Sequence, residues 1–531
     1  MDSASDHSEK QPHNAGNAVK ENDVDIAAAF ALGSDAPLDP AEAQRLKRKI
    51  DLHLMPLMCI LYLMTFADKI TLGQSAVLGI IQDTNLTQTQ FNWLNTIFYI
   101  SYLAFEYPQN LALQKFPVGK WMSINIFVWA VALLTHAACK SFGALFAVRF
   151  ILGMCEGAIT PGFMIVTSMF YTRQEQTRRV GYWFLMNGMG VIFLGLIAFG
   201  LIHSKVGILE SRVPLSILTN LIQTSNFQPW QWLMIITGLV TLLVSVTFWF
   251  FFPDSPVSAR FLTTEERAKA VQRIKVNQAG IENKHWKRDQ FIEAFRDPKT
   301  WLLALFVASS NIFNSVTNQR QLIVQQFGFT VGQTTLLGTV DGAVQILTIL
   351  SGVSLVRYIG HAYAAVACYV PAFIGSILLN TLPSHNKIGL LFSYWTSIYA
   401  VTPYVICIGW MGSITAGHTK KTTVNAIVLI GYAVGNAAGP AMWKKKYQPR
   451  NRVPWAILSG FCFFSAVVIL ALRTLLLLEN KRRDRERSDD DKYDDVYVAH
   501  VQADGTTIEK KVDRAFLDLT DRQNREFRYI M

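Results

Sequence analysis

Residues 145–170 read LFAVRFILGMCEGAITPGFMIVTSMF, and only two of these side chains, Arg149 and Glu156, are ionisable. A helix of this length extends about 39 Å at roughly 1.5 Å per residue, which exceeds the ~30 Å hydrocarbon core of a bilayer. The stretch therefore predicts a helix that spans a membrane. Seven positions separate the two charges, close to two helical turns, so both should lie on one face of that helix.

Similar apolar runs precede and follow this one along the chain. Short breaks separate them, except for one long hydrophilic stretch after the sixth run. This pattern predicts an all-α polytopic membrane protein. Its twelve transmembrane helices are expected near 54–76, 91–113, 121–140, 145–170, 180–203, 232–252, 299–318, 334–356, 362–382, 388–411, 422–442 and 454–478.

The composition supports a membrane protein and excludes several other classes. Hydrophobic residues make up 51% of the 531 residues and charged residues only 16%, against about a quarter in soluble proteins. Charge is concentrated outside the apolar runs, with 26 charged residues among the last 53. A soluble enzyme, a collagen-like chain and a secreted disulfide scaffold are therefore excluded. The six cysteines lie in or beside apolar runs without CxxC spacing, so we expect no disulfide framework, metal site or cofactor.

Polar segments divide the chain into five parts. These are a tail expected to be disordered over 1–43, a six-helix unit over 44–252, a central loop over 253–298, a second six-helix unit over 299–478 and a charged tail over 479–531. Lys and Arg concentrate in the inner segments of this scheme, which predicts that both termini and the central loop face the cytoplasm. One basic cluster, from Lys444 to Arg452, breaks this rule on the outer side. The net charge of +11 arises in short segments between apolar runs, so it does not indicate nucleic-acid binding.

Ionisable residues inside the predicted spans are the strongest signal of function. Charge is costly in hydrocarbon and usually faces a cavity or a partner. Besides Arg149 and Glu156, the first span contains Asp68 and Lys69, and the second contains Glu106. Such residues can place an acid and a base next to a bound anionic ligand. The alternative is that they only join helices to one another.

Polar and aromatic side chains mark two further spans. Asn311, Asn314 and Asn318 recur at i, i+3 and i+7 in the seventh span, which suits the wall of a hydrophilic cavity. Tyr399 and Tyr404 lie in the tenth span, where they can contact substrate. We predict the three asparagines and Tyr399 as substrate-binding residues. The alternatives are that the asparagines bridge helices and that the tyrosines only pack.

Several strings between residues 45 and 531 are similar to those of one transporter family. They include RKIDLHLMPL, FADKITLG, FEYPQNLALQKFPVGKW, RFILGMCEGAITPGFM, FFPDSPVSARFLTTEER, AGHTKKTTVNA and the tail string DLTDRQNREFRY. By these strings the chain resembles the major facilitator superfamily, and within it the fungal anion:cation symporters. The strings NSVTNQRQLIV and TLLGTVDG are similar to the allantoate permease branch.

This resemblance implies both a fold and a set of residue roles. It implies two six-helix bundles, alternating access and proton-coupled uptake of a small organic anion. Asp68 and Glu156 become candidate proton carriers, and Glu106 is a further one. Arg149 and Lys69 become their partners or the ligands of the substrate carboxylate. Arg149 is the first choice for that carboxylate, because its guanidinium can donate two parallel hydrogen bonds.

One segment departs from the family pattern. Val206–Gln223 adds 18 residues to the loop between the fifth and sixth spans. The codons for its Val-Gly, Leu-Thr-Asn and terminal Gln can look like fungal splice and branch signals. The coding length of the segment is a multiple of three nucleotides, so retaining it as an intron would keep the reading frame open. We hypothesise a retained intron, and a genuine loop insertion is the alternative.

The sequence thus predicts a secondary transporter rather than an enzyme. It should import a small organic anion, allantoate-like or another carboxylate, together with protons. We expect a monomer in the plasma membrane. An uncoupled facilitator and a transport-inactive nutrient receptor are the alternatives. Uptake with the proton gradient collapsed separates the first from symport, and binding without accumulation identifies the second.

Overall fold

The computed structural model describes residues 39–205, 227–275, 285–329, 331–485, 497–501, 507–511 and 518–531. The insertion 206–223 and most of the expected tail 1–43 lie outside these ranges. Nearly all of the described chain is helical, which confirms the predicted all-α class. Two short strands that were not predicted, β1 (Tyr497–Val501) and β2 (Thr507–Lys511), pair antiparallel in the C-terminal tail.

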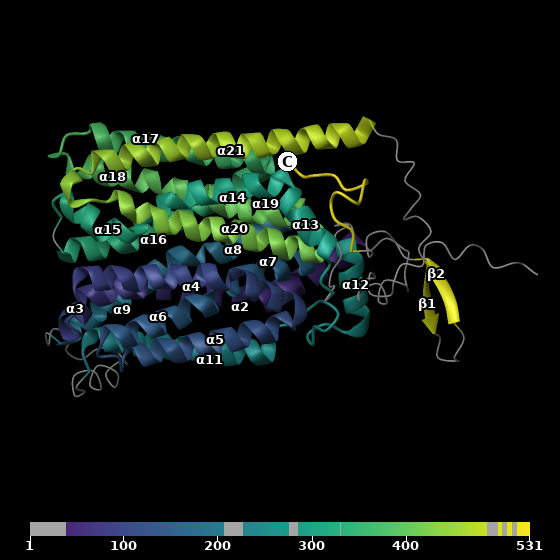
Figure 1. The fold of residues 1–531 in the computed structure, drawn as a ribbon, viewed down its shortest axis with the longest axis horizontal. Helices are drawn as coiled ribbons and strands as arrows, with labels where there is room; N and C mark the ends of the chain where they lie inside the picture. Colours follow the sequence, from purple (N-terminus) through teal and green to yellow (C-terminus); the bar gives the residue numbers. More distant parts are fainter. Residues whose placement is uncertain are drawn as a thin grey trace, which may run out of the picture.

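The N-terminal half crosses the helical body six times (Figure 1). The crossings are α2 (Pro40–Val77), α4 (Gln88–Lys115), α5 (Val118–His136), α6 with α7 (Phe142–Glu156 and Ile159–Phe170), α8 with α9 (Arg173–Phe184 and Met186–Lys205), and α11 (Pro229–Phe251). The short α3 (Ile80–Asp83) lies between α2 and α4. Because α2 begins at Pro40, the end of the segment expected as a tail belongs to the first crossing helix.

The C-terminal half repeats this arrangement as a second bundle, green to yellow in Figure 1. Its crossings are α14 (Pro298–Asn311) with η2 (Ile312–Asn314) and α15 (Ser315–Gln326), α16 (Val331–Ile359), α17 (His361–Thr381), α18 (Lys387–Ser397) with η3 (Ile398–Val401) and α19 (Thr402–Ile414), α20 (His418–Ala438) with η4 (Gly439–Met442), and α21 (Arg452–Arg485). The turn η5 (Lys445–Tyr447) precedes α21.

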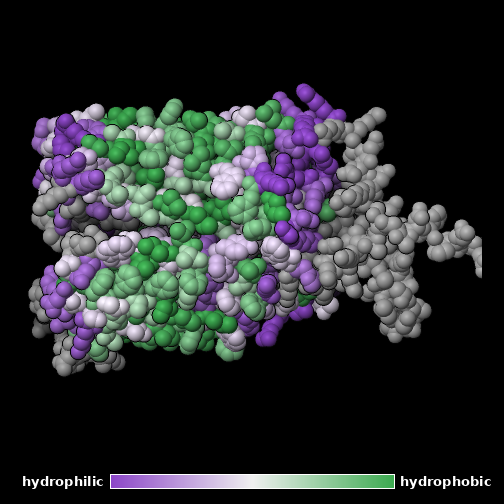
Figure 2. Space-filling view, in the orientation of Figure 1, coloured by the Kyte–Doolittle hydropathy of each residue, from purple (hydrophilic) through white to green (hydrophobic). Residues whose placement is uncertain are grey.

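The twelve predicted spans are confirmed in order along the chain. Within the described ranges, 11 helices or continuous helix pairs are long and apolar enough to cross a membrane. The remaining crossing is α4, whose 28 residues are long enough but include Glu106 and several Gln and Asn side chains. Figure 2 shows the result on the surface: hydrophobic residues form a band around the middle of the body, and hydrophilic residues collect at both ends.

Four crossings are interrupted along their length. α6 passes into α7 at Gly157, α8 into α9 at Leu185, α14 into α15 through η2, and α18 into α19 through η3. Irregular backbone at membrane depth is tolerated where it is buried in protein or lines a cavity. The apolar runs do not reveal these breaks, because a one-turn change of helix geometry leaves hydropathy unchanged.

The two bundles meet along three helix pairs, α9 with α16, α8 with α19 and α4 with α20. Glycine permits the closest approach, between α9 and α16. A Cβ added at Gly188 would lie 2.4 Å from the Gly342 carbonyl oxygen, and one at Gly342 would lie 2.5 Å from the Gly188 oxygen. The backbones of the two bundles are therefore in direct contact here, as small residues allow between membrane helices.

The central loop and the described part of the C-terminal tail collect at one end of the body, which we call the tail face (right in Figure 1). There α12 (Thr264–Lys275) begins with a side-chain cap, in which the Glu266 backbone N–H donates to Thr263 Oγ1 at 3.2 Å. The Glu266 carboxylate also pairs with Lys49 of α2 at 2.6 Å. A second short helix, α13 (Arg288–Arg296), lies between the loop and α14.

Residues 518–531 pack against the tail face. Asp521 is fully buried, and its carboxylate lies 2.6 Å from Lys299 Nζ and 2.9 Å from Lys420 Nζ. Burial alone would raise the pKa of Asp521, but the two lysine charges outweigh burial and hold the pKa below its usual range. A lowered carboxyl pKa stabilises the folded chain above the unfolded value of about 4, and that stabilisation is lost only in stronger acid.

We expect Gly188→Val to lower the thermal unfolding midpoint of the purified protein, by the equivalent of about 1–3 kcal/mol. The new side chain would meet backbone of α16, which cannot rotate away. Gly195→Val is the matched control, because a Cβ at Gly195 of the same helix meets nothing within 4 Å. Equal midpoints for the two variants would contradict the close contact between α9 and α16.

Candidate functional site

A small cavity lies between the two bundles, and both contribute to its wall. Each of the four helix breaks supplies lining residues: Thr160 after the first, Phe184 and Asn187 around the second, Asn311, Phe313 and Asn314 at η2, and Ala400 with Val401 at η3. The volume is about 40 Å³, enough for a few water molecules. The cavity in this structure is therefore small.

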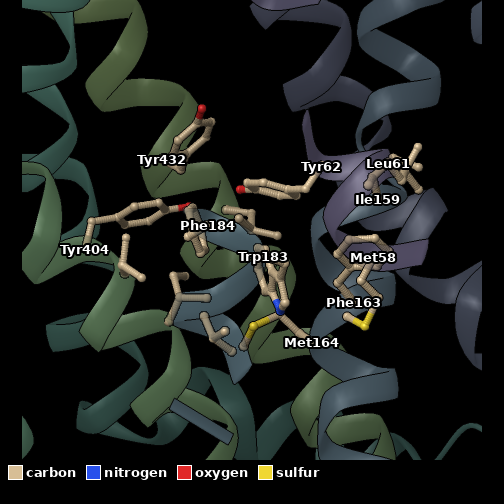
Figure 3. Packing of buried hydrophobic residues seen from close by; sticks show 14 of the residues in the cluster. Met58, Leu61, Tyr62, Ile159, Phe163, Met164, Trp183, Phe184, Tyr404 and Tyr432 are labelled. Carbon is tan, nitrogen blue, oxygen red and sulfur yellow. The ribbon is translucent and has the colours of Figure 1, made fainter. Parts of the chain in front are cut away.

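Aromatic side chains form one wall of the cavity. Figure 3 shows Tyr62 and Tyr404 pointing toward each other, with Phe184 and Tyr432 beside them; the four residues come from four different helices. The ring centroids are 4.9 Å apart for Tyr62 and Phe184, 5.6 Å for Phe184 and Tyr404, and 5.6 Å for Tyr404 and Tyr432. This chain of contacts joins the N-terminal bundle to the C-terminal bundle, so movement of one bundle must repack it.

Lys69 is the one charged residue among those that line the cavity. Its Nζ lies 2.7 Å from Glu156 Oε1, and it also lies 3.5 Å from the Tyr432 hydroxyl of the other bundle. The Lys69 side chain keeps 17% of its surface exposed, whereas the Glu156 side chain keeps 2%. The cation thus faces the cavity while its counter-charge lies behind it.

Glu156 and Arg149 are both buried in the N-terminal bundle, Glu156 as the last residue of α6. Within the described residues, Glu156 Oε2 and the Nε and Nη2 atoms of Arg149 have no hydrogen-bond partner. Arg149 is near enough to Asp68 and Glu156 to interact with both electrostatically, yet it is not among the cavity-lining residues. Buried polar atoms without partners are rare in native proteins, and they concentrate where groups change state.

Asp68 is positioned by a residue that the sequence did not indicate. The indole N–H of Trp129 on α5 donates to Asp68 Oδ2 at 2.6 Å, while Asp68 Oδ1 has no partner in the described part of the chain. A Trp within an apolar span normally only packs, so no pattern signalled this role. Asp68 is 2% exposed and lies one position before Lys69, which places the two residues on different sides of α2.

A comparison with a second buried acid shows how Asp68 differs from a structural ion pair. In the C-terminal bundle, Asp341 receives a hydrogen bond from Trp395 at 2.7 Å and a second from Arg320. Both oxygens of Asp341 are therefore used. The carboxylate of Asp341 thus has a hydrogen-bond donor at each oxygen, whereas Asp68 retains an oxygen without a donor, to which a proton can bind.

The other predicted site residues are distributed around this centre. Glu106 is fully buried and accepts from the Asn110 side chain at 2.8 Å; its Oε2 lies against Gly157 at the first break. Asn311 and Asn314 line the cavity, and the side chain of Asn318 lies outside the described residues. Tyr399 is not among the lining residues and contacts Ser351 at 3.4 Å. Its neighbour Tyr404 lines the cavity in its place.

We expect Trp129→Phe to destabilise the protein by about 1–3 kcal/mol, because it removes the donor to a buried carboxylate. Trp183→Phe is the control, since Trp183 is equally buried but its indole N–H has no partner among the described residues. The measurement is the thermal unfolding midpoint of both variants. If Trp183→Phe proves as costly as Trp129→Phe, the hydrogen bond to Asp68 does not matter for stability.

The chain is similar to known proteins over most of its length. The Major Facilitator Superfamily model matches residues 58–440. Allantoate permease of Saccharomyces cerevisiae is 31% identical over 525 residues, covering 95% of this chain and 90% of the relative. Thiamine pathway transporter THI73 of the same yeast is 33% identical over 493 residues, covering 91% and 86%. These matches confirm the resemblance drawn from the sequence strings.

A solved structure matches the fold. It is the proton:xylose symporter XylE bound to 6-bromo-6-deoxy-D-glucose, with a TM-score of 0.60 and 12% identity. The match covers 81% of this chain and 96% of XylE. Identity this low concerns the fold alone, and it confirms the expected architecture of two six-helix bundles.

Proposed function

Because this chain belongs to the Major Facilitator Superfamily, we propose that it imports a small organic anion together with protons. One observation carries the proposal. A single cation, Lys69, lines the cavity between the bundles, and it is paired with the buried carboxylate of Glu156. No acidic residue is found among the lining residues, all of which belong to the described ranges of the structure. An anion entering the cavity therefore meets one positive charge and several amide and hydroxyl donors.

Recognition of the anion is assigned first to Lys69. It is the charged group that an entering carboxylate reaches, and Asn311 and Asn314 supply polar groups on the opposite bundle. Arg149, the first choice from the sequence, lies outside the lining, so we assign it the role of counter-charge to Asp68 and Glu156 in this structure. The name of one relative, allantoate permease, supports a carboxylate such as allantoate as the substrate class.

Coupling follows from competition for Lys69. While Glu156 is ionised, its carboxylate holds Lys69 at 2.7 Å, and a substrate carboxylate must displace it. Protonation of Glu156 removes this competitor and avoids leaving an unpaired negative charge in a site of low polarity. Proton binding and anion binding thus favour one another through one lysine. Asp68, with its unused oxygen, is a second candidate proton-binding group, which the exchange at Lys69 does not involve.

The ion pair also touches the interface between the bundles. Lys69 contacts the hydroxyl of Tyr432 at 3.5 Å and lies 5.6 Å from its ring centroid. Tyr432 belongs to α20 and stacks on Tyr404 of α19. Rearrangement of Lys69 on substrate binding therefore changes contacts that hold the bundles together, as alternating access requires.

We propose that the tail face is cytoplasmic and that the protein resides in the plasma membrane. The clustering of Lys and Arg at this face supports the orientation. Residues such as Lys49, Lys269 and Arg273 lie there in ion pairs with neighbouring carboxylates. Import then begins at the opposite end and finishes at the tail face.

Glu156→Gln should uncouple transport, because glutamine imitates the protonated acid permanently. In proteoliposomes with an inside-alkaline gradient of one pH unit, a one-to-one symport supports about tenfold accumulation of a monoanion. The parent protein should approach this value, with uptake rising at acidic outside pH. The variant should exchange labelled allantoate, or another transported carboxylate, without accumulating it.

Accumulation by Glu156→Gln that equals the parent, with the same pH dependence, would remove Glu156 from the coupling mechanism. Uptake by the parent that persists unchanged after the proton gradient is collapsed would instead favour an uncoupled facilitator. Binding without uptake by the parent would favour a receptor.

Lys69→Gln should reduce anion uptake by at least about 30-fold at every pH, since it removes the cation that the substrate carboxylate meets. Lys115→Gln is the control, because Lys115 is an exposed lysine at the end of α4 and does not line the cavity. Initial rates of labelled uptake in cells lacking related transporters provide the measurement. Similar losses in both variants would show that net charge, and not Lys69 itself, matters.

A further inference from the structure

The segment 518–531 is built into the tail face of the C-terminal bundle. Its anchor is Asp521, which contacts Lys299 of α14 and Lys420 of α20 and also accepts from the Ala416 backbone N–H at 3.2 Å. The Tyr529 hydroxyl donates to the same carboxylate at 2.7 Å. One buried acid therefore ties the segment to two different helices.

Backbone carbonyls of the segment are bound by three more helices of the same bundle. Arg483 of α21 donates to the Phe527 carbonyl at 2.7 Å, and Trp410 of α19 donates to the Ile530 carbonyl at 2.7 Å. His361, the first residue of α17, lies 3.0 Å from the Met531 carbonyl through Nδ1. Such a set of specific contacts indicates a folded element.

Contacts to the N-terminal bundle come from the start of α8. The guanidinium of Arg173 lies 3.6 Å from the Phe527 ring centroid, and its Nη1 donates to the Arg528 carbonyl at 3.3 Å. One turn later, Thr177 Oγ1 lies 2.9 Å from His361 Nε2. The segment thus reaches across the line where the two bundles meet.

The backbones of the two bundles also approach each other closely at this crossing point. A Cβ at Gly409 of α19 would lie 2.6 Å from the Thr177 Cα of α8. For a substrate to leave through the tail face, α8 and α19 must separate. Their separation must break the contacts of Arg173 with Phe527 and Arg528, because Phe527 is fixed to the other bundle.

We propose that residues 518–531 act as a latch that holds the tail face closed. Arg173 connects this latch to the N-terminal bundle through its contacts with Phe527 and Arg528. The inference rests on the proposed function, since a closed face matters only in a protein that opens it during transport. The latch lies outside the substrate cavity, so Arg173 and Phe527 set how often this face opens without touching the substrate.

Hydrogen exchange of the full-length protein tests the latch without any substrate. Arg173→Ala should speed amide exchange about 3- to 30-fold in the segments 173–184 and 402–414, the range expected on losing a cation–π contact and a hydrogen bond. Arg178→Ala is the matched control, because Arg178 lies on the same helix, is exposed, and contacts the ring and the hydroxyl of Tyr182 one turn away. It should leave exchange in both segments unchanged.

Phe527→Leu provides a second, milder variant that keeps an apolar side chain and removes the ring. It should reproduce the effect of Arg173→Ala in the segment 173–184. Exchange equal to the parent in both variants would overturn the latch, and so would faster exchange spread over the whole C-terminal bundle, which would mark a purely structural tail. Neither outcome bears on proton-coupled uptake, which is measured separately.

Discussion

The ion pair between Lys69 and Glu156 is the interaction on which this account depends. Taking two charges out of water costs several kcal/mol per ion, and a close pair recovers that cost only when its geometry and hydrogen bonds are good. Here one carboxylate oxygen has no hydrogen-bond partner in the described structure, and the lysine faces a cavity. A pair built this way is poised to exchange its carboxylate for a ligand, which a purely structural pair is not.

Buried charges elsewhere in the chain show the contrast. Asp341 is fully hydrogen-bonded by Arg320 and Trp395, and Asp521 is held between two lysines and a tyrosine hydroxyl. Neither acid lines the cavity. The same residue types therefore serve two purposes in one fold. Satisfied acids join helices or anchor the tail. Of the incompletely satisfied acids, Glu156 pairs with the lysine that lines the cavity, and Asp68 keeps an unused oxygen.

The fold was largely predictable, because a bilayer imposes a length and a composition on every crossing helix. Charged residues of the site were also predictable, since their cost in hydrocarbon marks them in the sequence. Their pairing was not. Spacing along one helix suggested Arg149 as the neighbour of Glu156, and the family resemblance offered Lys69 as a partner without assigning it to either acid. Tertiary packing pairs Lys69 with Glu156. Trp129, Tyr432 and the tail contacts of Asp521 depend on long-range packing and leave no local pattern.

The most direct test of this account is a count of protons taken up when the anion binds. In weakly buffered solution at neutral pH, addition of a transported carboxylate to the purified protein should raise the pH of the medium, because binding displaces Glu156 from Lys69 and the freed carboxylate takes up a proton. The account predicts close to one proton per bound anion for the parent and almost none for Glu156→Gln. Saturating anion binding without proton uptake by the parent would contradict it.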